Sequence, residues 1–306
     1  MKQIQQIGNT PLSISVYSVK QAPTTLHEKG TLEIIFCLKG SVKFSYAYEE
    51  FTLNAGEYIS VDKDAYYLYD GKDNICISLY FDLKCFKDKY PFICENLFVC
   101  EGCAESTIEF PTPYHNQLKG MMIALLKYLL GHGANSRIIA VSEKIIDLFV
   151  EHFDVFFFHV KRLSHSDEHF RRTREINQYM RLHMKGKITI ESLAKEFKFT
   201  PGYMSEFMRK NSVGFRGMLA YIRANESESL LLNTDKTILE ISEECGFSDV
   251  KYYYSAFKKW YKCTPKQFRE HYGKIKEENL EPLELEDISS LIDELMTTHY
   301  METFLG

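Results

Sequence analysis

Cysteine is the residue type in this sequence whose spacing is easiest to test for chemistry. Four of the eight cysteines lie close together, Cys85, Cys94, Cys100 and Cys103, and the last two have C-x-x-C spacing. A zinc or redox site needs a second such pair or nearby histidines, and Cys85 and Cys94 are too far apart to form one. We therefore expect reduced thiols that pack as small hydrophobic residues, with no disulfide framework.

Two segments have the pattern of a helix-turn-helix. They are ITIESLAKEFKFTPGYMSEFMRK, Ile188–Lys210, and KTILEISEECGFSDVKYYYSAFKKW, Lys236–Trp260. In each, an apolar-patterned helix ends in a short turn and a capping residue begins a second helix. The predicted caps are Thr200, which precedes Pro201, and Ser248, because Ser and Thr accept from unpaired N–H groups and Pro is tolerated at the first helical position.

The turn of the second segment contains Gly246, at a position where a tight turn requires positive φ. A long helix predicted over Phe215–Asn233 joins the two segments. The second helix of each segment is therefore expected to lie at the surface on a rigid support. A helix placed in this way can enter a DNA major groove. Two such units in tandem indicate a DNA-binding domain more strongly than one.

Helical position predicts which side chains of the two recognition helices face outward. Tyr203, Met204 and Phe207 are expected to face the core in the first, and Tyr253 and Phe257 in the second. Outward residues and nearby cations supply base and phosphate contacts. The predicted DNA-binding residues are Gly202, Ser205, Glu206, Arg209, Lys210, Arg223, Val250, Lys251, Tyr254, Ser255, Lys258 and Lys259.

The runs ESLAKEF and LLLNTDKTILEISEECGFSDVKYYYSAFKKWYKCTPKQFREHY resemble the DNA-binding domain of AraC/XylS-type transcription regulators. The resemblance implies a seven-helix, two-lobed domain that reads two successive major-groove segments. Relatives commonly carry Arg at the positions of Glu206 and Ser255 and basic residues near Glu226 and Glu228. Because this chain lacks them, we expect modest affinity dominated by contacts to the DNA backbone.

The charge is partitioned along the chain. Residues 171–275 contain 20 Lys and Arg against 12 Asp and Glu, although the whole chain carries a net charge of −5. Residues 277–306 contain nine acids and neither Lys nor Arg. The basic charge is therefore confined to the helix-turn-helix region, as a phosphate-contacting surface requires.

Residues 1–112 are predicted to be rich in strands. Short Ile-, Val-, Phe- and Tyr-rich runs are separated by turn residues at Lys39–Gly40, Asn54–Gly56, Asp70–Gly71 and Asp73–Asn74. This spacing is typical of a sandwich or small barrel. EIIFCLKGSVKF and FTLNAGEYISVDKDAYY resemble the cupin-type effector domain that often precedes this DNA-binding domain. The predicted fold class is α+β, with a cupin-like β-barrel before an all-α domain.

A metal centre in that barrel is short of ligands. Only His27 and Glu33 lie near the right place, and Tyr66 and Tyr67 stand where metal-binding cupins have a later histidine. We expect no metal, no cofactor and no enzymatic activity, because no nucleophile–base set appears either.

The aromatic residues of the barrel allow two interpretations. Most are explained as core and sheet-face residues; alternatively, some line a small-molecule pocket, which the resemblance favours. A sugar suits such a pocket, as do other polar organic molecules. The predicted effector-binding residues are His27, Glu33, Phe36, Tyr46, Tyr58 and Tyr67.

Helical periodicity begins after Pro113 and predicts helices over residues 116–130 and 137–160. Their apolar surface exceeds what one packing face needs, so residues 113–160 are predicted to be a dimerisation segment as well as core. A polar linker is expected over residues 161–170, before the DNA-binding domain at 171–275. The predicted dimerisation residues are Leu118, Met122, Leu125, Leu129, Ile146 and Phe149.

Residues 276–306 form a predicted acidic, amphipathic tail whose helix begins near Glu286 and Asp287, where acids favour a helix N-terminus. Either this tail docks on its own domain or is solvated, or it covers the basic DNA surface and gates it.

Two functions remain open. The first is a sequence-specific, ligand-responsive transcription regulator, expected to be a cytoplasmic activator. The second is a regulator that acts mainly through protein contacts, with weakened DNA binding. The implied partners are double-stranded DNA, a small-molecule effector, a second copy of the chain and RNA polymerase; no membrane partner is expected because no apolar run reaches spanning length.

Overall fold

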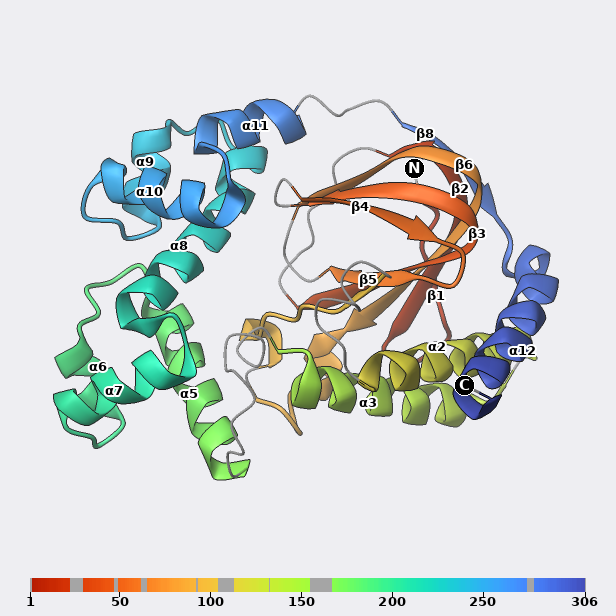
Figure 1. Cartoon of the computed structure of the whole chain (residues 1–306), viewed down its shortest axis with the longest axis horizontal. Helices are drawn as coiled ribbons and strands as arrows, with labels where there is room; N and C mark the ends of the chain where they lie inside the picture. The colour runs from red at the N-terminus through yellow and green to blue at the C-terminus, as the bar shows by residue number, and fades with distance from the viewer. Residues whose placement is uncertain are drawn as a thin grey trace. The chain divides into compact units, whose positions relative to one another are not determined.

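The computed structural model confirms the α+β class. It describes residues 2–22, 30–46, 49–61, 65–91, 93–103, 113–131, 133–154, 167–273 and 278–305. The chain divides into two compact units, Met1–Asp154 with Ile275–Gly306, and Val155–Lys274 (Figure 1). The first combines an antiparallel sheet with helices, and the second is helical. Among the described residues, no helix has both the length and the hydropathy needed to cross a bilayer.

The sheet of the N-terminal unit is antiparallel throughout and has the strand order β1-β2-β6-β3-β5-β7, with β4 on β3 and β8 on β2. Among the described strands no pairing joins β7 back to β1, so the predicted cupin-like barrel is not closed. The strands are β1 Gln5–Gln6, β2 Leu12–Gln21, β3 Thr31–Tyr46, β4 Glu49–Asn54, β5 Tyr58–Val61, β6 Tyr66–Asp82, β7 Glu101–Gly102 and β8 Asn279–Leu283.

Three of the predicted turns lie within long strands. Lys39–Gly40 lies inside β3, and Asp70–Gly71 and Asp73–Asn74 lie inside β6, where the register between these strands shifts. Gly40 has φ +68°, and a Cβ there would lie 2.3 Å from the main-chain oxygen of Asp73. A glycine therefore marks a bend within a strand here rather than its end. The predicted turn at Asn54–Gly56 does separate β4 from β5.

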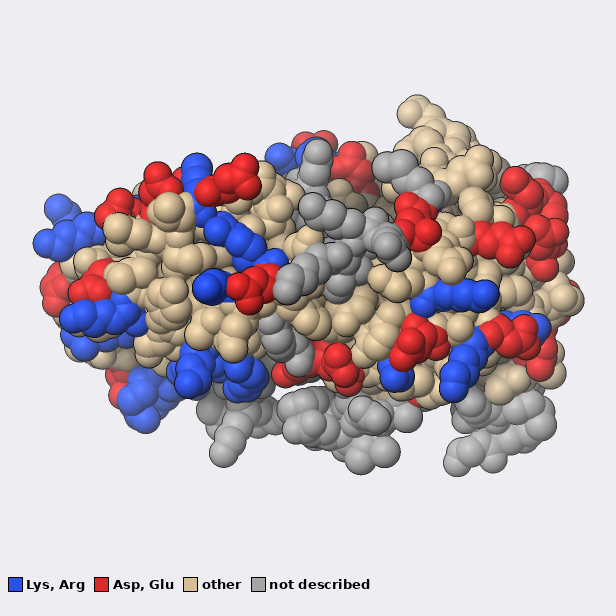
Figure 2. All heavy atoms as spheres, turned by 90° about the horizontal axis from the view of Figure 1, so that it is seen from above, with Lys and Arg blue, Asp and Glu red and all other residues tan. Residues whose placement is uncertain are grey.

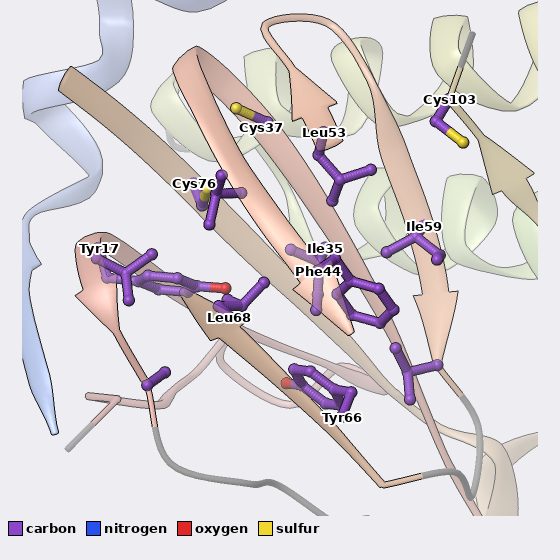
Figure 3. Packing of buried hydrophobic residues seen from close by; sticks show 14 residues of the cluster. Tyr17, Ile35, Cys37, Phe44, Leu53, Ile59, Tyr66, Leu68, Cys76 and Cys103 are labelled. Atoms are coloured by element: carbon purple, nitrogen blue, oxygen red, sulfur yellow. The ribbon is translucent and has the colours of Figure 1, made fainter. Parts of the chain in front are cut away.

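Both faces of the sheet, here called inner and outer, are buried on the central strands. Tyr17, Ile35, Phe44, Leu53 and Tyr66 belong to the cluster on the inner face (Figure 3). The outer face is apolar on all three central strands, where alternate residues are buried. These outer residues are Leu12, Ile14 and Val16 of β2, Leu32, Ile34 and Phe36 of β3, and Ile77, Leu79 and Phe81 of β6.

Helices α2, Tyr114–Leu130, and α3, Asn135–His152, belong to the same unit. Tyr58 of β5 attaches α2 to the sheet by donating to the main-chain oxygen of His115 at 3.0 Å. Phe98 packs edge-on against Phe149 of α3 at 5.6 Å between ring centroids. Short 3₁₀ helices, Leu83–Phe86 and Ile93–Glu95, follow β6. Part of the predicted second helix, residues 155–160, lies outside the described residues.

The C-terminal segment is built into the N-terminal unit. Strand β8 pairs with β2, from Val16 opposite Leu283 to Gln21 opposite Asn279. A 3₁₀ helix, Leu285–Ile288, then leads to α12, Ser289–Leu305, which packs on α2 (Figure 1). The helix predicted near Glu286 is present, but the strand before it was not predicted.

The second unit contains seven helices within residues 167–273, as the resemblance implied: α5 Asp167–His183, α6 Ile190–Glu196, α7 Pro201–Asn211, α8 Gly214–Asn233, α9 Ile238–Glu244, α10 Val250–Tyr261 and α11 Pro265–Gly273. Its core includes the fully buried Met204, Tyr253, Phe257 and Phe268. The predicted linker lies partly outside the described residues, and its last four residues, from Asp167, begin α5.

Candidate nucleic-acid interface

Each helix-turn-helix begins with a capping box. Thr189 and Ser192 cap α6, and Thr237 and Glu240 cap α9. Such reciprocal bonds satisfy two otherwise unpaired N–H groups and fix where the helix starts. A capping box therefore fixes the start of the first helix in both helix-turn-helix segments.

The two recognition helices, α7 and α10, are also capped, though not as predicted in both cases. The hydroxyl of Thr200 accepts from the Tyr203 N–H at 3.2 Å, with Pro201 at the first helical position. In the second helix-turn-helix, Asp249 caps α10 by accepting from the Lys251 N–H at 2.8 Å. The prediction that Ser248 is the capping residue is therefore wrong. The carboxylate is the stronger acceptor at a helix N-terminus.

The turns that orient the two helices both use positive φ. Gly246 has φ +82°, and a Cβ there would lie 2.5 Å from the main-chain oxygen of Met184, so the predicted requirement for glycine is confirmed. Lys198 occupies the corresponding turn of the first helix-turn-helix with φ +57°. A side chain at such a φ is strained, but here nothing requires glycine through close approach.

Aligning the helices on their caps pairs residues that lie 49 positions apart. Between Gly202 and Lys210 nine pairs result: in six both residues are exposed, and in the other three both are buried. The two helices therefore expose the same face, as expected of two successive DNA-reading helices. The exposed pairs are Gly202 with Lys251, Tyr203 with Tyr252, Ser205 with Tyr254, Glu206 with Ser255, Arg209 with Lys258, and Lys210 with Lys259.

One of these pairs was missed in the sequence. Tyr203 was expected in the core but is 48% exposed, and Tyr252, which was not singled out, is 62% exposed. Both lie three residues before a predicted contact, Glu206 or Ser255, and so on the same helix face. The spacing of three residues from a predicted contact could have identified both tyrosines as exposed.

Glu206 is held by cations of its own helix. Its two carboxylate oxygens accept from Arg209 at 2.8 and 2.7 Å, and the ammonium of Lys210 lies 3.4 Å away. Hydrogen bonding from Arg209 lowers the pKa of Glu206 to about 2. The carboxylate therefore remains charged and offsets one cation of the first recognition helix.

The second recognition helix is more basic. Lys258 and Lys259 are exposed in its last turn, and Lys251 is exposed in its first turn, 3.4 Å from the Asp249 carboxylate. Val250 is half-buried. Figure 2 shows Lys and Arg side chains gathered along the lower edge of the molecule at the left of the view. The exposed lysines of α10 supply positive charge of the kind that contacts to the DNA backbone need.

Three charged residues of α8 take part in internal contacts. Arg223 donates to the main-chain oxygens of Met184 at 2.9 Å and Gly186 at 3.0 Å, which supports the α5–α6 connection rather than reaching outward. Glu228 is buried and accepts from Tyr261. It is therefore not exposed where it could repel DNA, contrary to the expectation from the sequence. Glu226 lies 3.9 Å from the buried Arg181.

The predicted effector-binding residues are not brought together. Phe36 and Tyr58 pack edge-on at 6.1 Å on the outer side of the sheet, whereas Glu33 is fully buried on its inner face. Tyr46 donates to Glu101 at 2.6 Å, and Tyr67 stacks on Tyr69 at the surface. His27 lies outside the described residues. Strand alternation separates side chains that composition alone had grouped.

Two cavities of this unit have other linings. One of about 430 Å³ is lined by residues that include Gln5, Leu129 and Glu284, and one of about 360 Å³ by residues that include Ile14 and Leu283. Of the predicted effector-binding residues that the structure describes, none lines either cavity.

The cysteines all carry free thiols, and only Cys85 is exposed. The Cys100 sulfur lies 3.7 Å from Nδ1 of the buried His115, whose pKa burial lowers to about 4. Within the part of the chain that the structure describes, no group of three His, Cys, Asp or Glu residues is placed to hold a metal ion.

The six predicted dimerisation residues are core residues of this chain. Leu118, Met122, Leu125, Ile146 and Phe149 are fully buried, and Leu129 is 6% exposed. These side chains are therefore not exposed for contact with a second copy in this structure. Helix α12 supplies a cover for α2 within the same chain, which accounts for part of the apolar surface that had suggested dimerisation.

Sequence comparisons find similarity to transcription regulators. A helix-turn-helix domain family matches residues 193–271. An uncharacterized HTH-type transcriptional regulator of Staphylococcus aureus (strain COL) is 24% identical over 248 residues, which are 78% of this chain and 31% of that protein. The uncharacterized HTH-type transcriptional regulator YijO of Escherichia coli (strain K12) is 30% identical over 98 residues, 32% of this chain and 35% of that protein. The chain thus spans about a third of the length of these curated relatives.

Solved structures similar to the chain include ToxT from Vibrio cholerae, with a TM-score of 0.43 and 13% identity over 85% of this chain and 98% of ToxT. The C-terminal domain of AraT, a response regulator from Geobacillus stearothermophilus, has a TM-score of 0.30 and 32% identity over 32% of this chain and 83% of that one. The capped tandem segments and the family match agree: residues 193–271 of this chain form a helix-turn-helix domain.

Proposed function

We propose that this chain is a transcription regulator that binds double-stranded DNA sequence-specifically through α7 and α10. The observation that carries the proposal is the equivalence of the two exposed helix faces, with six paired positions and cations in the last turn of each helix. The names of the relatives, HTH-type transcriptional regulators, support the same role.

Within this proposal, the residues of the two helices divide by chemistry. Lys251, Tyr254 and Ser205 are exposed near the helix N-termini, where side chains reach base edges. Lys258 and Lys259 contact phosphates, which set register and affinity without reading sequence. Because Glu206 offsets Arg209, the second helix contributes more of the electrostatic affinity than the first.

The remaining parts of the proposal follow from the resemblance. A small molecule bound by the N-terminal unit changes the DNA-binding state through its differential affinity for two conformations. The regulator acts as an activator that contacts RNA polymerase, and it binds DNA as a homodimer through exposed residues other than the six core residues named above.

The test is selection of bound sequences from random duplexes by the purified full chain, at about 50 and 200 mM salt. We expect enrichment of a bipartite site with two short segments about one helical turn apart. Salt-sensitive retention with no enriched sequence would contradict sequence-specific binding and favour a regulator that acts through protein contacts.

A matched pair of variants locates the interface. Lys258→Ala with Lys259→Ala should weaken retention of every duplex and reduce the slope of log affinity against log salt by up to about 2. The control is Lys39→Ala with Lys43→Ala on β3, which removes the same charge from two exposed lysines of the N-terminal unit. Equal effects of the two pairs would show that Lys258 and Lys259 act only through net charge.

A further inference from the structure

The inner face of the sheet carries a buried polar group among apolar residues. Glu33 of β3 and Ser78 of β6 are fully buried, as are Tyr17 of β2 and Tyr66 of β6. The Tyr66 hydroxyl donates to Glu33 Oε2, and the Tyr17 hydroxyl lies 2.9 Å from Ser78 Oγ. Figure 3 shows the hydroxyls of Tyr17 and Tyr66 turned toward one another. We name these four residues the ammonium site, for the group that they hold.

The occupant is the side chain of Lys2. Its ammonium donates to Glu33 Oε1 at 3.1 Å, to Tyr66 Oη at 2.8 Å and to Ser78 Oγ at 3.4 Å, so three acceptors match its three N–H bonds. It also lies 4.7 Å from the ring centroid of Tyr17 and 5.2 Å from that of Tyr66, within cation–π range. A carboxylate, two oxygens and two aromatic faces thus surround one cation.

The site and its occupant differ in how firmly they are held. The four residues of the ammonium site lie on the three long central strands. Lys2 lies on a segment whose next four residues are exposed and whose strand, β1, forms only two residue pairs with β2. Releasing Lys2 therefore breaks few other contacts, whereas the site is fixed by the sheet.

A second buried polar group lies on the same face. Ser15 lies directly opposite Ser78 in the register of β2 and β6, is 1% exposed, and its hydroxyl makes no hydrogen bond to any residue that the structure describes. Buried hydroxyls normally find a partner, and the position of this one beside the site offers a further contact to a ligand larger than a lysine side chain.

We propose that the ammonium site is the effector subsite of the N-terminal unit and takes the protonated amino group of a small organic amine, in place of Lys2. This inference rests on the proposed ligand-responsive function. Charge decides the ligand class: a neutral sugar would leave the buried Glu33 carboxylate without a counter-charge, and an anion would repel it.

The experiment uses the full chain with Lys2→Ala, in which propylammonium replaces the three carbons and the ammonium group that the substitution deletes. Thermal unfolding is followed with propylammonium chloride, with n-propanol of similar size, and with NaCl at matched ionic strength. We expect Lys2→Ala to melt several degrees below the unsubstituted chain, and propylammonium to restore the melting temperature saturably while n-propanol does not. Adding Glu33→Gln to Lys2→Ala should abolish that response.

A second variant covers the case in which Lys2→Ala does not fold. Lys2→Met keeps an unbranched stem up to the position of Cε and removes the ammonium group, and ammonium chloride, compared with NaCl, is then the probe. A response to n-propanol equal to that to propylammonium, or an amine response that survives Glu33→Gln, would overturn the proposal. The melting readout needs no DNA, so its failure and a failure to bind DNA are separate results.

Discussion

At the scale of single residues, Glu206 shows how a recognition helix can be weakened from within. Its carboxylate binds Arg209 through two hydrogen bonds and lies near Lys210. Both cations occupy positions equivalent to Lys258 and Lys259 of the second helix. A phosphate must therefore compete with an internal partner for Arg209.

We predict that Glu206→Gln raises affinity for all duplexes several-fold at low salt and steepens the salt slope by about 1, because Arg209 is released for phosphate contact. Fluorescence anisotropy with a random duplex measures both quantities. The control is Glu270→Gln on α11, which removes the same charge from another exposed ion pair. A loss of affinity confined to the selected site would instead assign Glu206 to base reading.

At the scale of elements, the turn before α10 depends on one glycine. Gly246→Ala adds a Cβ that would lie 2.5 Å from the Met184 oxygen at φ +82°. We predict that it lowers the free energy of unfolding of the helical unit by about 2–4 kcal/mol, measured by urea denaturation.

Gly202→Ala is the matched control for that substitution. Gly202 is in α7, its φ is not positive, and a Cβ there meets nothing within 4 Å. The same chemical change should stabilise the unit by up to about 1 kcal/mol. Similar destabilisation by both variants would show that the turn is not the cause.

The junction between the sheet and α2 predicts a pH dependence. His115 is buried with a pKa lowered to about 4 from an ordinary value of 6.5. The unfolded chain therefore binds a proton first as pH falls, and stability is lost between about pH 6.5 and 4. We expect the N-terminal unit to lose roughly 2 kcal/mol between pH 7 and 5 from this group, measured by urea denaturation.

His115→Gln isolates the contribution of this imidazole. Glutamine does not titrate, so the loss of stability between the two pH values should shrink by the same amount although the variant is less stable at pH 7. An unchanged loss in the variant would place the acid sensitivity in other groups.

At the scale of the whole molecule, the chain enters the helical unit from the N-terminal unit and returns to it. Residues 155–274 are an insertion between α3 and β8, so the helical unit is connected to the N-terminal unit at both ends. β8 pairs with β2, the strand that carries Tyr17 of the ammonium site. One strand therefore contacts both the proposed effector site and the segment that returns from the helical unit.

We predict that Ile292→Ala destabilises the N-terminal unit by about 2–4 kcal/mol, because Ile292 is fully buried on α12. Met296→Ala, one turn later at a 44% exposed position, should change stability by less than about 0.5 kcal/mol. Urea denaturation measures both. Raised DNA affinity without loss of stability in the Ile292 variant would favour the hypothesis that the tail gates the DNA surface.

Much of the helical unit was predictable because its signals are local. Capping residues, the glycine turn and the helical period lie within a few positions of what they determine, and the tandem units followed from them. The cap predicted at Ser248 lies at the next residue, and Tyr203 was assigned to the core although it is exposed. Both errors concern single residues within helices that were predicted correctly.

The sequence by itself thus determined the α+β class, the two recognition helices and most of their exposed faces. Only the tertiary structure decided that Glu33 is joined by Lys2 and Tyr66, that the predicted dimerisation residues are core, and that residues 279–305 complete the N-terminal unit. These pairings join residues that are far apart in the chain, and no local pattern encodes them. They depend on which groups pair with a buried charge and which element packs on an apolar face, and both are decided by the folded structure.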